Sequence, residues 1–195
     1  MSRFWLMAYL ALGLLTGCAL GPQTVALTPR VDAPAPAIGG GRSLALEVVD
    51  ARSSPVFGSR GGVYKTALIT SRTPVDRVVR EALAERLTAS GFRVESPGQP
   101  SALGLSVTIE RIDYQADGQP LVDQVRLEAE IRARARNGGR ELTGHYRSSL
   151  TRQVLKAPDE ATNERLINQL LGEVLARLLR DAALQELLAA PTGGV

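Results

Sequence analysis

The sequence contains very few of the residues that bind metals, form disulfides or carry catalytic protons. One cysteine and one histidine occur among its 195 residues, and aromatic residues make up 4%. A single cysteine excludes an intramolecular disulfide, and no Cys/His cluster is available for zinc. The formal net charge is only +3, without the clustered Lys and Arg that indicate nucleic-acid binding. We therefore expect no metal, no cofactor and no nucleic-acid partner, and a fold that depends on its apolar core.

The N-terminus contains an apolar run, residues 4–14, that is too short for a membrane-spanning helix of roughly 20 residues. Arg3 precedes this run, and Leu15-Thr16-Gly17-Cys18 ends it, as in a secretory signal peptide. The small residues before the cysteine resemble the lipobox of bacterial lipoproteins, in which signal peptidase II cuts before a cysteine that is lipidated. The sequence thus predicts a signal peptide at 1–17 and a lipidated Cys18. The alternative is a buried thiol at the end of an uncleaved segment.

The predicted lipid also indicates where the protein resides. Three acyl chains on one residue suffice for stable membrane anchoring, whereas a single chain is marginal. Residue 19 is alanine. In lipoproteins of the enteric type an aspartate at this position retains the protein at the inner membrane. The resemblance therefore implies the periplasmic face of the outer membrane rather than the inner membrane.

Residues 18–41 are predicted to be a flexible tether. The segment has no apolar period and is rich in proline and glycine, so it should not bury enough surface to become ordered. A folded domain is expected at 42–190, followed by a disordered tail at 191–195. The tether would let this domain stand a few tens of Å from the membrane, at roughly 5–6 Å times the square root of its length.

The first half of the domain combines a strand and a helix. The apolar run Leu44–Val49 is typical of a strand buried on both faces. A helix is predicted to follow, with Thr73 as its cap, Pro74 in its first turn and Gly91 at its end. Residues 92–94 resemble a second short strand.

The second half predicts three strands and a long helix. Alternation at 103–109 changes phase at Arg111-Ile112, which indicates a bulge. Residues 125–136 alternate apolar and charged side chains, and Asn137-Gly138 predicts a tight turn into a strand at 140–154. One helix is expected over Asp159–Ala190. The elements predict an α+β fold: a single two-layer domain with a mostly antiparallel sheet of about five strands, covered on one face by two helices.

Few residues are suited to catalysis. His145, the only histidine, lies in a strand pattern that places it on the solvated face. No Gly-x-Ser-x-Gly elbow is present. Convergence of Glu47, Asp50 and Asp113 into a carboxylate site is left open by the sequence. We therefore expect no catalytic residue, with a cell-wall hydrolase as the alternative.

The loop at 50–64 is the most specialised segment. Its glycines and arginines could form an anion pocket from backbone N–H groups and guanidinium groups. Alternatively, the glycines supply positive φ angles while Asp50 pairs with Arg52 or Arg60. The candidate binding residues are Asp50, Arg52, Gly58, Arg60, Gly61, Gly62 and Tyr64.

The lipobox, the proline-rich segment and the loop together resemble the YajG-type family of bacterial lipoproteins. The matching residues are Val49-Asp50-Ala51-Arg52, Gly58-Ser59-Arg60-Gly61-Gly62, Tyr64 and Gly91-Phe92-Arg93-Val94. The resemblance implies an outer-membrane lipoprotein with a small α+β domain and no assigned enzymatic activity. We expect a non-catalytic binding or scaffolding module that contacts an envelope protein or peptidoglycan. A peptidoglycan hydrolase or a regulator of cell-wall synthesis is the alternative.

Overall fold

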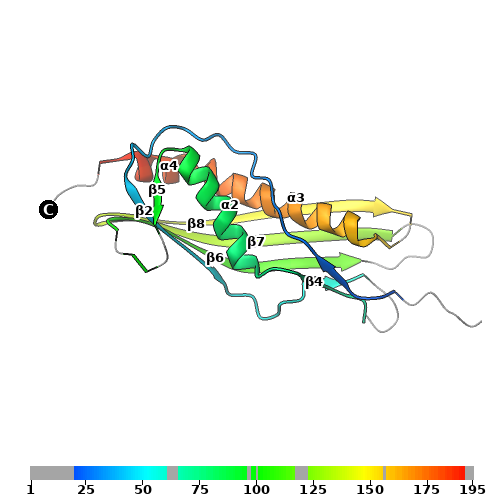
Figure 1. Ribbon diagram of the computed structural model, residues 1–195. Coiled ribbons are helices and arrows are strands. Elements are labelled where there is room, and N and C mark those ends of the chain that lie inside the picture. The colour runs from blue at the N-terminus through cyan, green and yellow to red at the C-terminus, as the bar shows by residue number, and fades with distance from the viewer. Residues whose placement is uncertain are drawn as a thin grey trace, which may run out of the picture.

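The computed structural model describes residues 20–60, 66–95, 98–99, 101–116, 123–155 and 157–191. The predicted signal peptide and Cys18 lie outside these residues, as does all of the predicted tail except Pro191. Within these residues, one mixed sheet of eight strands carries three helices on one face (Figure 1). The predicted α+β class is confirmed. The predicted sheet of about five mostly antiparallel strands under two helices is wrong in strand number, strand direction and helix number.

Three long antiparallel strands form the regular part of the sheet: β6 (Leu103–Ala116), β7 (Asp123–Asn137) and β8 (Arg140–Val154). The predicted alternation is confirmed, because the odd-numbered apolar residues of β7 from Val125 to Ala135 are buried. The predicted bulge is confirmed as a register shift between Ile109 and Arg111. The apolar period therefore fixed which face of these strands meets the helices.

The turn between β7 and β8 differs by one residue from the predicted pair. Asn137 is itself paired with Arg140, so Gly138 and Gly139 form the turn, with φ of +58° at Gly138. The Asn137 side chain donates hydrogen bonds to the carbonyls of Leu187 (2.8 Å) and Ala190 (2.9 Å). This asparagine thus connects the hairpin to the C-terminal helix.

The other edge of β6 pairs with two separate groups of strands. Its first half lies parallel to β2 (Ser43–Asp50), which in turn pairs with β5 (Arg93–Glu95). Its last residues lie parallel to β3 (Gly58–Ser59). β3 pairs antiparallel with β4 (Leu68–Ser71), and β4 lies parallel to β1 (Gln23–Val25). β2 is buried on one face only, contrary to the prediction, and Val49 is 44% exposed.

The helices are α2 (Val75–Ala89), α3 (Glu160–Leu179) and α4 (Ala182–Ala189). Gly91, with φ of +87°, follows the end of α2 as predicted. Thr73 does not cap this helix: Pro74 occupies the cap position without a side-chain hydrogen bond. The predicted single terminal helix is wrong, because Asp181 starts a new helix by accepting from the N–H groups of Ala183 (2.9 Å) and Leu184 (3.2 Å).

The segment predicted to be a flexible tether is, from residue 20 onward, packed on the domain (Figure 1). Val25 and Leu27 are buried, and β1 is a strand of the sheet. The backbone N–H groups of Ala26 and Thr28 donate to Glu164 (2.9 Å) and Asn168 (2.6 Å) of α3. The backbone N–H groups of Ala26 and Thr28, which lie outside any helix or strand, thus find their acceptors on α3, about 140 residues away.

Gly172 of α3 tests this packing. An alanine in a helix interior normally stabilises by about 1 kcal/mol relative to glycine. Here an added β-carbon would lie 2.2 Å from the carbonyl oxygen of Arg30, in the packed N-terminal segment. We therefore expect Gly172→Ala to lower the free energy of unfolding by about 1–3 kcal/mol, measured by urea denaturation. A more stable variant would show that the segment does not lie on α3.

Candidate functional site

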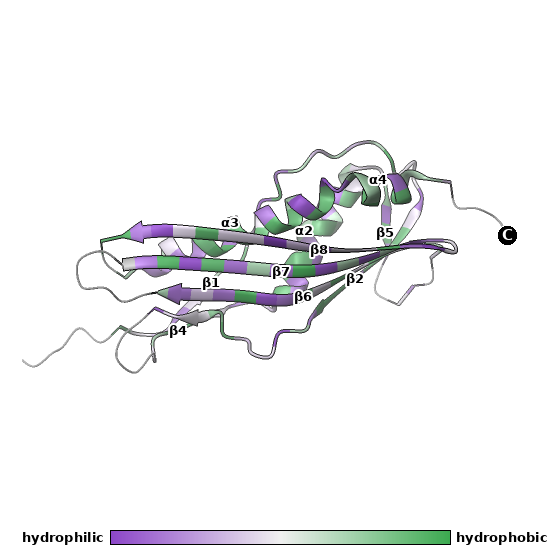
Figure 2. Cartoon of the chain, turned by 180° about the vertical axis from the view of Figure 1, so that it is seen from behind, coloured by the Kyte–Doolittle hydropathy of each residue, from purple (hydrophilic) through white to green (hydrophobic). Residues whose placement is uncertain are grey.

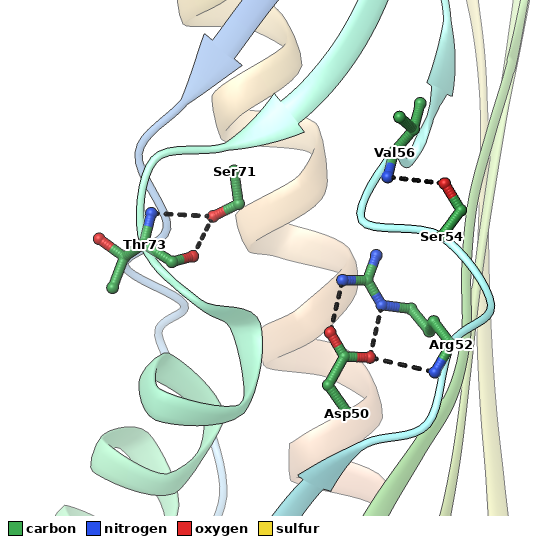
Figure 3. Close-up of polar contacts among 6 residues, drawn as sticks. All are labelled: Asp50, Arg52, Ser54, Val56, Ser71 and Thr73. Atoms are coloured by element: carbon green, nitrogen blue, oxygen red, sulfur yellow. Dashed lines mark hydrogen bonds and ion pairs between the residues drawn. The ribbon is translucent and has the colours of Figure 1, made fainter.

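The residues of the predicted loop are largely engaged with the protein itself. Arg52 makes a two-pronged contact with Asp50, with distances of 2.8 Å from Nε to Oδ1 and 2.7 Å from Nη2 to Oδ2 (Figure 3). The Arg52 guanidinium also lies 5.1 Å from the centre of the Phe57 ring, and its side chain is only 6% exposed. Of the two predicted pairings of Asp50, the structure shows the one with Arg52.

The charge of Asp50 is stabilised by this contact. Partial burial by itself raises the pKa of Asp50, but the hydrogen bonds and charge of Arg52 outweigh it and hold the pKa below its usual value. One nitrogen, Nη1 of Arg52, is buried without a hydrogen-bond partner. Asp50 and Arg52 therefore form a fixed ion pair at the end of β2.

Arg60 connects two distant parts of the chain. Its Nε and Nη2 donate to the carbonyl of Pro158, at 3.1 and 2.8 Å, and its Nη1 donates to the carbonyl of Gly21, at 3.1 Å. Pro158 precedes α3 and Gly21 precedes β1. Arg60 thus holds the start of the chain against the β8–α3 connection, and does not pair with Asp50.

Gly58 allows two strands to approach closely. A β-carbon at this position would lie 1.9 Å from the backbone oxygen of Tyr114. Its role is close approach rather than a positive φ angle. Gly61, Gly62 and Tyr64 lie outside the described residues, so their part in a binding loop stays a prediction.

The face of the sheet opposite the helices is left uncovered (Figure 2) and carries charged side chains of both signs. At its centre Glu130 lies 2.8 Å from Arg111 and also contacts Arg147. The hydrogen bond from Arg111 lowers the pKa of Glu130 against a smaller opposing effect of burial. Arg132 pairs with Glu110 at 3.1 Å. The open face, defined here as this surface of β6, β7 and β8, is thus a network of mutually neutralising charges.

His145 lies on the open face, as predicted, with its side chain 69% exposed and 3.9 Å from Glu110. Within the described ranges, no three His, Cys, Asp or Glu residues are placed to hold a metal ion. Glu47 accepts a hydrogen bond from the Ser106 hydroxyl (3.4 Å), Asp113 faces Arg111 (3.8 Å), and Asp50 accepts from Arg52. Glu47, Asp50 and Asp113, the three carboxylates of the suggested catalytic site, therefore contact three different partners.

A groove of about 900 Å³ lies between α3 and residues 28–32. Its charged lining mixes both signs, and none of the predicted loop residues belongs to it. The charged residues are Arg30, Asp32, Glu164, Arg165, Glu173, Arg177 and Arg180.

A tyrosine–carboxylate contact, missed from the sequence, joins β8 to the break between α3 and α4. The Tyr146 hydroxyl donates to Asp181 at 2.7 Å. This hydrogen bond lowers the pKa of Asp181 despite partial burial, whereas burial and the carboxylate raise the pKa of Tyr146. Asp181 follows Leu178-Leu179-Arg180 within an apparently continuous helical pattern, and only its capping preference indicated a break.

This contact predicts a change in acid sensitivity. Asp181 has a lowered folded-state pKa, so its contribution to stability is present above its unfolded pKa and is lost as the pH falls below about 4. Tyr146→Phe should destabilise the protein at neutral pH, by about 1 kcal/mol. It should also lose less stability than the wild type between neutral pH and about pH 3. Urea unfolding at both pH values measures this; equal acid sensitivity of the two proteins would contradict it.

Comparison with known proteins defines the class. A family model described as "Uncharacterized lipoprotein" matches residues 29–189, so the chain belongs to this family of lipoproteins. The chain is 23% identical over 181 residues to the Escherichia coli K12 protein named "Uncharacterized lipoprotein YajG". The aligned residues cover 90% of this chain and 91% of that protein. The predicted YajG-type resemblance is confirmed.

A solved structure shares the fold. Protein XCC0632 from Xanthomonas campestris superimposes with a TM-score of 0.50 at 18% identity, covering 88% of this chain and 96% of that one. Across the described part of the chain, no helix has both the length and the apolar character needed to cross a bilayer.

Proposed function

We propose that the protein is a lipid-anchored, non-catalytic binding module at the periplasmic face of the outer membrane. Membership of a lipoprotein family supports anchoring through Cys18, the cysteine of the lipobox. The open face of β6, β7 and β8 is the single observation that carries the binding role. It presents three strands of 14–15 residues that the helices leave uncovered (Figure 2).

The chemistry of the open face suits a protein partner. Its ion pairs are partly exposed: Arg134 and Glu141, 2.6 Å apart, have side chains 64% and 45% exposed. Exposed pairs of this kind contribute only about 0–1 kcal/mol each, so exchanging them for charges of a partner costs little. Charged groups of both signs on one face of a sheet favour specificity for a complementary surface. We therefore favour an envelope protein over peptidoglycan as the partner.

In-cell photocrosslinking tests this proposal. A photoreactive amino acid at Thr143, on the open face beside Arg134, should yield a defined adduct with one envelope protein. The same group at Glu85, exposed on α2, is the matched control and should not yield this adduct. Reversing the charge of Arg132 and Arg134 should abolish the Thr143 adduct. Identical adducts from Thr143 and Glu85, or none from Thr143, would refute the open face as the binding surface.

Zymography tests the non-catalytic part of the proposal. The purified mature protein should leave peptidoglycan intact in the gel. A lytic band that disappears in Asp50→Asn would instead establish a hydrolase.

A further inference from the structure

The start of the folded chain lies very close to the predicted lipid anchor. The Gly21 carbonyl is held by Arg60 at 3.1 Å, and Gln23, which begins β1, is buried. Only Ala19 and Leu20 separate Gly21 from Cys18, and the three extended Cα–Cα steps from Cys18 to Gly21 span at most about 11 Å. If Cys18 carries the lipid, as the proposed function holds, the adjoining end of the domain must lie at the membrane surface.

Strand register identifies this end of the domain. Leu68 of β4 is aligned with Ser59, Ser59 with Gln115, and Gln115 with Arg126. β8 ends nearby at Val154, which pairs with the first residue of β7. We define the proximal end as the end of the sheet formed by Leu20–Gln23, Leu68, Ala116, Val125 and Val154–Leu155.

Exposed leucines gather at the proximal end. Four large apolar residues are exposed among those the structure describes, and three of them lie here: Leu20 (36%), Leu68 (40%) and Leu155 (85%). A leucine exposed to this extent gains stability by leaving water. Arg152, also exposed near the end of β8, offers a guanidinium group that suits lipid phosphates.

We propose that the proximal end docks on the phospholipid bilayer, with Leu20, Leu68 and Leu155 in the membrane interface. We favour the bilayer over a protein as the binding partner of this surface because the chain between Cys18 and Gly21 is short. A lipid on Cys18 therefore keeps the leucines near the bilayer, whether or not another protein is bound. The domain then lies on the membrane surface instead of standing away from it on a long tether.

Docking also orients the functional surface. β7 and β8 each contain 15 residues and extend about 50 Å from the proximal end. The turn between β7 and β8 lies at the opposite end of these strands from the proximal end (Figure 1). Docking therefore places this turn farthest from the membrane, with the open face extending from the lipid surface into the periplasm.

Tryptophan quenching tests the orientation. The only tryptophan of the chain is Trp5, within the predicted signal peptide, so an introduced tryptophan is the sole one in the mature protein. Leu155→Trp places it at the proximal end, and Arg140→Trp places it at the far end of the same strand. Each lipidated variant is reconstituted in phosphatidylethanolamine–phosphatidylglycerol vesicles with brominated acyl chains. Bromine should quench the tryptophan at 155 by more than half and leave that at 140 unchanged.

The outcomes separate docking from anchoring. Co-flotation with vesicles and acyl labelling are measured first, and their absence would refute anchoring at Cys18. A floated protein with equal quenching at both positions, or none at 155, would refute docking while leaving anchoring intact. The tryptophan at 155 could instead be shielded from water but not quenched by bromine, in a protein that sediments as a dimer. This result would show that a second copy of the chain covers the surface, and it would also overturn the proposal.

Discussion

Replacing Gly58 by alanine is expected to be among the most damaging single substitutions in the domain. The new β-carbon would lie 1.9 Å from the backbone oxygen of Tyr114 and 2.8 Å from its carbonyl carbon. A backbone group cannot rotate away as a side chain can, so β3 and β6 must separate. The hydrogen bond from the Tyr114 N–H to the Phe57 carbonyl (2.8 Å) lies in the same place. We expect a loss of about 3 kcal/mol or more.

Gly139 provides the matched control for this substitution. Nothing lies within 4 Å of a β-carbon built at Gly139, in the turn between β7 and β8. Gly139→Ala should therefore change stability by less than about 0.5 kcal/mol. Urea denaturation of both variants measures the difference. Equal stability of the two variants would contradict the close approach of β3 and β6.

Arg60→Ala is expected to lower the free energy of unfolding by about 2–3 kcal/mol. The substitution removes three hydrogen bonds from a charged donor and leaves the carbonyl of the buried Pro158 without these donors. The loss should also free residues 20–25, because Arg60 holds Gly21. Thermal denaturation reports the stability, and hydrogen exchange at β1 reports the release.

Two further variants make the Arg60 prediction specific. Arg152→Ala removes an exposed arginine whose guanidinium donates to the adjacent Thr151 carbonyl (3.3 Å), and should change stability by less than about 0.5 kcal/mol. Arg60→Lys should recover only part of the loss, because an ammonium group lacks the fork that reaches both carbonyls. Full stability in Arg60→Ala would show that Arg60 does not fasten the two segments.

The long strands and α2 could be predicted because their signals are local. The alternation from Val125 to Ala135 specifies one buried face, and the phase change near Arg111 specifies the bulge. Gly91 ends α2 through a positive φ angle that glycine adopts freely. In each case the residues that decide the structure are neighbours in sequence.

The packed N-terminal segment could not be predicted because its partners are distant. Proline and glycine gave residues 18–41 the composition of a tether. Its polar groups are nevertheless satisfied by Glu164, Asn168 and Arg60, and Gly172 leaves room for the Arg30 carbonyl. The short strands β1, β3 and β4 were missed for the same reason, since two to four residues carry no readable period.

The sequence showed that the loop at 50–64 has an unusual composition, but it did not show which groups the side chains of the loop contact. Sequence proximity suggested Asp50 as a partner of Arg52, which the structure shows at 2.7 Å. The acceptors of Arg60 lie 39 and 98 residues away, at Gly21 and Pro158. The glycines and arginines of the loop indicated an unusual backbone. The acceptors that each arginine contacts depend on the fold and could not be predicted from the loop sequence.

The proposed anchoring of the protein depends on lipid attachment at Cys18, and the mass of the mature N-terminus tests this attachment. Intact-protein and peptide mass spectrometry after metabolic labelling with palmitate should find a chain that begins at Cys18 and carries acyl groups. Cys18→Ala should remain an unlabelled precursor that retains residues 1–17. A mature wild-type chain that begins elsewhere, or equal labelling of wild type and Cys18→Ala, would contradict lipid attachment at this cysteine.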